Sequence, residues 1–199
     1  DSDFANTLTV NNAFDMEGDL NLTAANGGSD VVVNAGGNLR KSSGTGTATL
    51  GAFVDVAAGT LGVDAGTLEV FGADNRGSVE VDSGATLLVL TSAREPGFMN
   101  NDGGTIVGGG TLGVGTLSTS SGTFVPVDDL ANGGVGTLTI AGDVFLGDDG
   151  NQLDIDLAGG GGVAGSDHDH LEVQGALSSE TSGALTLGTV NLKAVNGYG

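Results

Sequence analysis

Apolar and polar residues alternate along most of this chain, in short runs separated by small or polar residues. Typical runs are Leu68-Glu69-Val70 and Leu138-Thr139-Ile140, and most are about three to five residues long, bounded by Gly, Asn, Asp or Ser. A repeat of two is the period of a β-strand that has one face buried and the other in water. No stretch shows a helical period. The pattern therefore predicts an all-β protein of many short strands joined by turns.

A second pattern is a repeated triplet, in which glycine is followed by threonine and an apolar residue. Glycine can turn the backbone, and the β-branched and apolar residues after it favour the start of a strand. A repeated turn-and-strand unit is typical of coils built by stacking, because no single unit can bury its own apolar side. The triplets are Gly59-Thr60-Leu61, Gly66-Thr67-Leu68, Gly110-Thr111-Leu112, Gly115-Thr116-Leu117 and Gly136-Thr137-Leu138, with near-copies at Gly104-Thr105-Ile106, Gly122-Thr123-Phe124 and Gly188-Thr189-Val190.

Together these patterns predict a single-stranded parallel β-helix, or β-solenoid, that forms one domain over residues 1–199. With rungs of roughly 20 residues stacked about 4.8 Å apart, we expect about nine or ten rungs and a rod of about 45 Å. Short strands at this spacing also fit an antiparallel sandwich. The coil is favoured by the repeated triplet, by the scarcity of large aromatic side chains and by asparagines at the expected corners. These are Asn26, Asn34, Asn38, Asn75 and Asn132.

One segment, residues 92–104, breaks the alternation. It contains one of the two prolines, and Arg94, Phe98 and Met99 lie close together in it. We predict a loop that projects from the rod and offers these three residues to a ligand or partner, because exposing Phe98 and Met99 is costly without one. The alternative is a loop that folds back over the rod.

Composition and charge narrow the range of functions. The 39 glycines are accompanied by only 2 prolines and no strict three-residue repeat, which excludes collagen. With 38% hydrophobic residues and a mean hydropathy of +0.14, the chain is too apolar to be disordered. The formal charge of −20 argues against nucleic acid and anionic membranes as partners, because phosphate binding needs clustered Lys and Arg. There is no cysteine for a disulfide framework and no apolar run long enough to span a membrane.

The most specific string runs from Gly165 to Gly175 and reads Gly-Ser-Asp-His-Asp-His-Leu-Glu-Val-Gln-Gly. This string resembles the passenger regions of bacterial autotransporters and related surface proteins, in which a Gly-Ser-Asp-x-Asp-x-Leu-x-Val-x-Gly segment follows a glycine-rich turn. The resemblance covers the chain well from about Gly136 onward, and earlier only through the rhythm of the triplets. It implies a right-handed parallel β-helix, exported and displayed outside a Gram-negative cell as an adhesin, a stalk or a matrix component.

The same string holds the candidate metal-binding residues Asp167, His168, Asp169 and His170. If Leu171 faces inward, the two aspartates do so as well, and the histidines lie on the wet face of the strand. Glu172 shares that wet face, and two histidines with a carboxylate two residues apart on a strand can bind Zn²⁺ or Ni²⁺. The aspartates make calcium a candidate cofactor. The alternatives are a solvated strand face for the histidines and, for the aspartates, capping of backbone N–H groups at a corner.

Catalysis has little support in the sequence. Asp154 and Asp156 form a carboxylate pair of the kind used in glycoside hydrolysis, but an exposed strand face explains them more simply. Only 5 lysines and arginines are available to neutralise an acidic polysaccharide, and no nucleophile or phosphate-binding motif is present. Together with what the resemblance to autotransporter passengers implies, this predicts a non-enzymatic, extracellular structural or adhesive β-solenoid, displayed on a bacterial surface or assembled into a fibre.

The expected partners are other copies of the chain, packed head to tail or side by side, or glycans and proteins of a host or neighbouring cell. The alternative function is a carbohydrate-active β-helix, either a polysaccharide lyase or hydrolase or a glycan-binding spike. Neither end of the sequence has the character of a cap, so we expect a fragment or processed part of a longer chain.

Overall fold

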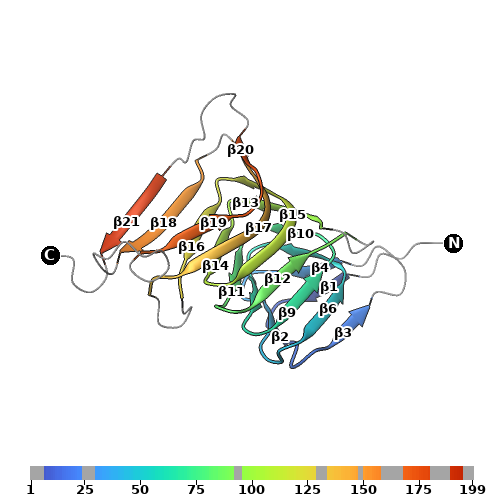
Figure 1. The fold of residues 1–199 in the computed structure, drawn as a ribbon. Helices are drawn as coiled ribbons and strands as arrows, with labels where there is room; N and C mark the ends of the chain where they lie inside the picture. The colour runs from blue at the N-terminus through green and yellow to red at the C-terminus, as the bar shows by residue number, and fades with distance from the viewer. Residues whose placement is uncertain are drawn as a thin grey trace.

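The short alternating runs form strands that wind into a three-faced coil, and successive rungs of the coil stack along one axis (Figure 1). The computed structural model describes residues 7–23, 30–91, 96–128, 134–147, 150–157, 168–179 and 189–194. All pairings between the named strands are parallel, and the described residues contain no helix. The prediction of a parallel β-helix is thereby confirmed, and the antiparallel sandwich is excluded.

Each rung contributes one strand, or half of a long strand, to each of three faces. The first face contains β1 (Thr7–Val10), β4 (Asp30–Val33), β7 (Phe53–Val56), β10 (Ala73–Asn75), β13 (Phe98–Asp102) and β20 (Leu177–Ser179). The second face contains β2 (Ala13–Asp15), β5 (Asn38–Lys41), β8 (Thr60–Val63), β11 (Ser78–Val81), β14 (Thr105–Gly108), β16 (Thr123–Pro126), β18 (Gln152–Leu157) and β21 (Thr189–Ala194). The third face contains β3 (Asn21–Thr23), β6 (Thr47–Gly51), β9 (Thr67–Val70), β12 (Thr86–Val89) and β19 (His170–Val173).

Two long strands, β15 (Thr111–Ser120) and β17 (Thr137–Leu146), run from the third face into the first. The first half of β15 pairs with β12 and its second half pairs with β13, and the pairing of β15 with β17 shifts register between Gly113 and Thr116. At Gly142 of β17, a Cβ atom would lie 2.0 Å from the carbonyl oxygen of Val114 on the preceding rung. Glycine is therefore required at this corner by the close approach of two backbones.

The core is a set of columns in which inward side chains of one rung stack on those of the next. On the second face such a column contains Phe14, Leu39, Leu61, Val79, Ile106, Phe124 and Leu153. Burial of each large apolar side chain contributes about 1.5–3 kcal/mol relative to exposure in water. Because the neighbours in a column come from adjacent rungs, a rung gains this stabilisation only when it is stacked.

Most of the segment predicted to project as a loop belongs to the coil instead. Residues 92–95 lie outside the described part of the chain, but residues 98–102 form β13, which pairs with β10 on one side and β15 on the other. The prediction was wrong here because Asn101 occupies an inward position next to Met99, so the polar–apolar alternation is hidden.

The described residues form fewer rungs than predicted. Among them the second face contains eight strands, which at about 4.8 Å each give an axis of about 35 Å. Later rungs are longer than expected, since the chain between the paired residues Leu153 and Val190 includes residues 158–167 and 180–188, which are not described.

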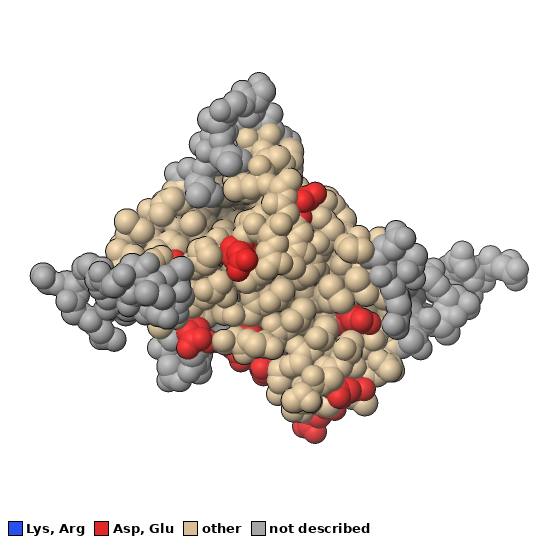
Figure 2. Space-filling view, in the orientation of Figure 1, with Lys and Arg blue, Asp and Glu red and all other residues tan. Residues whose placement is uncertain are grey.

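The visible surface is acidic. Figure 2 shows Asp and Glu side chains scattered over one side of the coil, with no Lys or Arg among the described residues in that view. Within the described ranges, no helix has the length and apolar character needed to cross a membrane.

Candidate functional site

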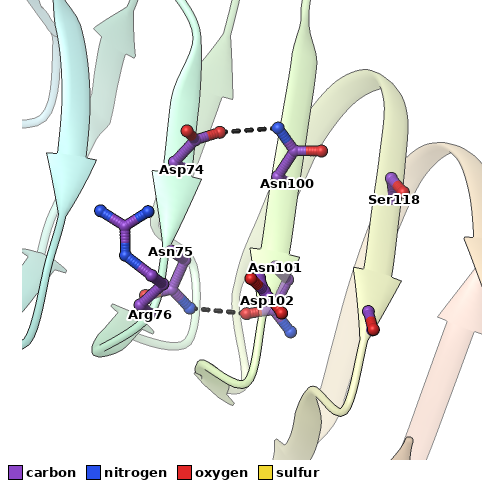
Figure 3. A pocket seen from close by; sticks show the side chains of 8 residues that line it. Asp74, Asn75, Arg76, Asn100, Asn101, Asp102 and Ser118 are labelled. Atoms are coloured by element: carbon purple, nitrogen blue, oxygen red, sulfur yellow. Dashed lines mark hydrogen bonds between the residues drawn. The ribbon is translucent and has the colours of Figure 1, made fainter. Parts of the chain in front are cut away.

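The outer surface of the first face carries a hollow lined by polar side chains (Figure 3). Its volume is about 350 Å³, and its lining residues come from β10, β13 and β15 and the positions next to them. The register pairs Asp74 with Asn100 and Asn100 with Ser118, so outward side chains of three successive rungs meet here. The hollow is lined by Asp74, Asn75, Arg76, Asn100, Asn101, Asp102, Ser118 and Ser120.

Hydrogen bonds across the strands hold the acidic and amide groups of this hollow in place. Asn100 Nδ2 donates to Asp74 Oδ1 over 2.7 Å, and the amide oxygen of Asn100 points to the side of Ser118 (Figure 3). Arg76 Nη2 donates over 2.6 Å to Oδ1 of Asp55. The hollow therefore presents carboxylate, amide, hydroxyl and guanidinium groups in a fixed arrangement.

Beneath the hollow lies a buried polar column made of Asn75, Asn101, Thr119 and Asn151. Asn75 and Asn101 are both 0% exposed, and Asn75 Nδ2 donates to Asn101 Oδ1 over 2.8 Å. Asn101 Nδ2 donates over 3.3 Å to Thr119 Oγ1, which in turn donates over 2.8 Å to Asn151 Oδ1. The amide groups of Asn75 and Asn151 also form hydrogen bonds with backbone groups at the corner. Because no buried side-chain polar atom of the described residues lacks a partner, the column gives the hollow a rigid floor.

Aromatic residues make up only 4% of this chain, yet phenylalanine recurs at outward positions of the first face. Of the 7 phenylalanines, Phe53, Phe98 and Phe145 lie on this outer surface, on β7, β13 and β17. The ring of Phe53 extends over Gly72 of the next rung, where a Cβ atom would lie 2.8 Å from Phe53 Cδ2. Phe98 is 50% exposed and lies two residues before Asn100 on the same side of β13. An exposed aromatic ring thus stands beside the polar hollow.

The second face carries an ion cluster of Arg40, Asp64 and Glu80. Arg40 pairs with both carboxylates, although Glu80 is two rungs away. The guanidinium spans this distance because Gly62, which lies between Arg40 and Glu80 in the register, has no side chain; a Cβ atom there would lie 2.8 Å from Arg40 Cζ. Desolvation by burial lowers the pKa of Arg40, but the hydrogen bonds and charges of Glu80 and Asp64 outweigh it, so the pKa is raised overall. The cluster joins three rungs, and with two carboxylates against one guanidinium it stays net negative.

Lys41 is the largest fully buried side chain among the described residues. Its inward position on β5 brings the ammonium group to a corner, where Nζ donates to the carbonyl oxygens of Ser43 over 2.6 Å and Gly44 over 3.0 Å. Asp19 Oδ1 lies 3.3 Å from the same nitrogen. These contacts indicate that Lys41 fastens the corner between the second and third faces.

Asp169, one of the predicted metal ligands, lies at a corner of the coil. It is 4% exposed, and its two carboxylate oxygens accept hydrogen bonds from the backbone N–H groups of Gly136 over 2.7 Å and Asp156 over 2.6 Å. Desolvation by burial raises the pKa of Asp169 despite these bonds. This geometry is the corner capping that the sequence offered as the alternative to metal binding.

The other predicted ligands are less constrained. His168 and His170 are partly exposed, next to Leu171, which packs on the core, and Asp167 lies outside the described residues. In the part of the chain that the structure describes, no three His, Cys, Asp or Glu side chains are arranged to bind a metal ion. Metal binding by Asp167, His168, Asp169 and His170 stays a prediction.

The three predicted partner contacts have different positions. Arg94 falls in the segment that is not described, and Phe98 is exposed on the first face. Met99 is fully buried in the core, so the prediction that its side chain contacts a partner was wrong.

The carboxylate pair of the kind used in glycoside hydrolysis lies on β18. Asp154 Oδ1 accepts hydrogen bonds from Gln152 Nε2 over 2.8 Å and from Asn191 Nδ2 over 2.7 Å. The backbone N–H of Asp156 is the one capped by Asp169. Asp154 is therefore tied into the sheet, as expected of a structural carboxylate.

Comparison with known proteins gave no relative: no protein-family model, no curated protein sequence and no solved structure matches this chain.

Proposed function

We propose that this chain is a non-enzymatic, extracellular structural and adhesive module, displayed at a bacterial surface or assembled into a fibre. The observation that carries the proposal is the unbroken parallel pairing through the eight strands of the second face. In such a coil each rung contacts only its neighbours, so length follows rung number and every face offers a regular lattice of outward side chains. These are the properties of a spacer that also presents a binding surface.

The charge supports the same role. A formal charge of −20 keeps a glycine-rich β surface soluble and disfavours lateral clumping of neighbouring coils. Apolar side chains are instead exposed at the first and last described rungs, where end-to-end packing against a second copy would cover them. They are Leu8, Leu20 and Leu22 in the first rung and Leu177, Val190 and Leu192 in the last.

The carbohydrate-active alternative has a weaker basis. Asp154 already accepts two amide hydrogen bonds within the sheet, which would hinder its use as a nucleophile or base. The chain's arginines also serve structural contacts where they are described, Arg40 with Asp64 and Glu80, and Arg76 with Asp55.

An adhesion assay tests the proposal. Particles coated with the purified chain are expected to adhere to cells or to each other more than particles coated with a Met99→Asp variant, in which a charge in the core unfolds the coil. Equal adhesion of the two would contradict the proposal. Turnover of a polysaccharide that is lost in Asp154→Asn and Asp156→Asn would establish the enzyme instead.

A further inference from the structure

We infer that the outer surface of the first face binds a neutral polysaccharide, through hydrogen bonds at Asp74 and Asn100 and through stacking of a sugar ring on Phe98. This inference rests on the proposed adhesive function, for which it names the class of ligand.

The hollow matches a ligand that carries many hydroxyl groups. A hydroxyl both donates and accepts hydrogen bonds, and the hollow offers the acceptor oxygens of Asp74 and Asp102, the amide of Asn100 and the hydroxyl of Ser118. Polar groups at fixed positions on a concave surface are what orient a small polar ligand. An apolar ligand would leave these groups desolvated and unpaired.

The exposed ring of Phe98 supplies the apolar part of the site. Sugar rings present C–H groups on one face and hydroxyl groups around the rim, so they pair an aromatic surface with nearby polar side chains. Phe98 and Asn100 are separated by about 7 Å along the strand, roughly the width of one sugar ring. A half-exposed phenylalanine is also costly to leave in water.

The arrangement extends along the coil axis, which favours a polymer over a single sugar. Phe53 and Phe98 occupy the same outward column two rungs apart, with only Gly72 between them. Two rung spacings are about 10 Å, so an extended polysaccharide running along the axis could contact both rings with alternate residues. The bond from Asn100 to Asp74 and the buried polar column fix the surface before binding, which reduces the entropy lost on binding.

The negative charge of this face disfavours binding of acidic polysaccharides. Asp55, Asp74 and Asp102 all lie on this face, and Asp55 already neutralises Arg76. Uronate or sulfate groups would be repelled by these carboxylates and by the overall charge of −20 on the chain. A protein partner is not favoured, because a stable interface needs a larger apolar centre than the separated rings of Phe53 and Phe98 provide.

The test is a binding panel of neutral polysaccharides (β-glucan, xylan, galactomannan and dextran) and acidic ones (polygalacturonate, alginate and hyaluronate), followed by titration of the best binder. We expect binding to at least one neutral polysaccharide, and about tenfold weaker binding for Phe98→Ala and for Asn100→Ala. The matched control is Asn191→Ala, because Asn191 also donates to an aspartate on the adjacent strand over 2.7 Å, but on the second face. This control should bind as the unaltered chain does, and all variants should keep its circular dichroism spectrum.

Several results would overturn the inference. They are binding to no neutral polysaccharide, a preference for the acidic ones, unchanged affinity in Phe98→Ala, or equal weakening in Asn191→Ala. If coated particles still adhere to cells while the panel shows no neutral binder, the adhesive function stands and the inference fails. If neither adhesion nor glycan binding occurs, both fail.

Discussion

The buried polar column gives the sharpest test of the fold, because Asn100 and Asn101 are adjacent asparagines on opposite sides of one strand. Asn101→Ala removes two side-chain hydrogen bonds, from Asn75 Nδ2 and to Thr119 Oγ1. It also leaves one N–H of Asn75 unpaired in the interior, although the same amide keeps its bond to Thr105 O. Loss of the bond to Thr119 Oγ1 costs about 1 kcal/mol, and the buried donor of Asn75 left unpaired costs about 1–3 kcal/mol, so we expect a total loss of about 2–4 kcal/mol.

Asn100→Ala is the matched control, since it removes a single hydrogen bond at the surface and should cost less than about 1 kcal/mol. Thermal unfolding followed by far-UV circular dichroism measures both variants. For a chain of this length we expect the midpoint to fall by roughly 4–16 °C in Asn101→Ala and by no more than about 4 °C in Asn100→Ala. Equal shifts, or a larger shift for Asn100→Ala, would refute the assigned inward and outward positions of β13.

Three further substitutions test other parts of the coil. Gly108→Ala should lower the free energy of unfolding in urea by more than about 4 kcal/mol, because Gly108 has φ of +135° and a Cβ atom there would lie 1.9 Å from a backbone oxygen. Gly84→Ala is the control: Gly84 has φ of +80° but no atom within 4 Å of the added Cβ, so the loss should be only about 1–2 kcal/mol. Burial raises the pKa of Asp169 in the folded chain above its value of about 3.9 in the unfolded chain. The protonated side chain therefore stabilises the fold fully below about pH 3.9, and this contribution is lost as the pH rises through the raised pKa. The stability advantage of the unaltered chain over Asp169→Asn should therefore shrink between about pH 3 and pH 7, and an advantage that grows over this range would contradict the burial effect. Lys41→Met leaves two corner carbonyl oxygens without their donor and should lower the unfolding free energy by about 1–3 kcal/mol; an unchanged midpoint would show that the ammonium does not fasten the corner.

The overall fold was predictable because the alternation of the sequence directly encodes the two sides of each strand. In Leu68-Glu69-Val70, for example, both apolar residues are fully buried and Glu69 lies outside. Asn75 was also expected at a corner, and it does lie there. The strand at residues 98–102 was missed because Asn101 points inward, and its burial is possible only through partners contributed by other rungs.

The candidate site was not predictable from the sequence, because it depends on the register between rungs of unequal length. Asp74, Asn100 and Ser118 are far apart in the chain and become neighbours only through the pairing of β10, β13 and β15. The sequence does contain a local signal for the site, because Phe98, Asn100 and Asp102 occupy every second position and so lie on one side of a strand. Only the inward position of Met99 shows that this side is the outer one.

The two long strands have a mechanical consequence. A coil made of separate short strands can be unzipped one rung at a time, with each corner acting as a hinge. β15 and β17 each continue through a corner as one strand, although the pairing between them shifts register there, so each strand ties its third-face half to its first-face half. We therefore expect these rungs to separate after the end rungs when tension is applied along the axis, so that the hollow that β15 helps to line keeps its shape longer.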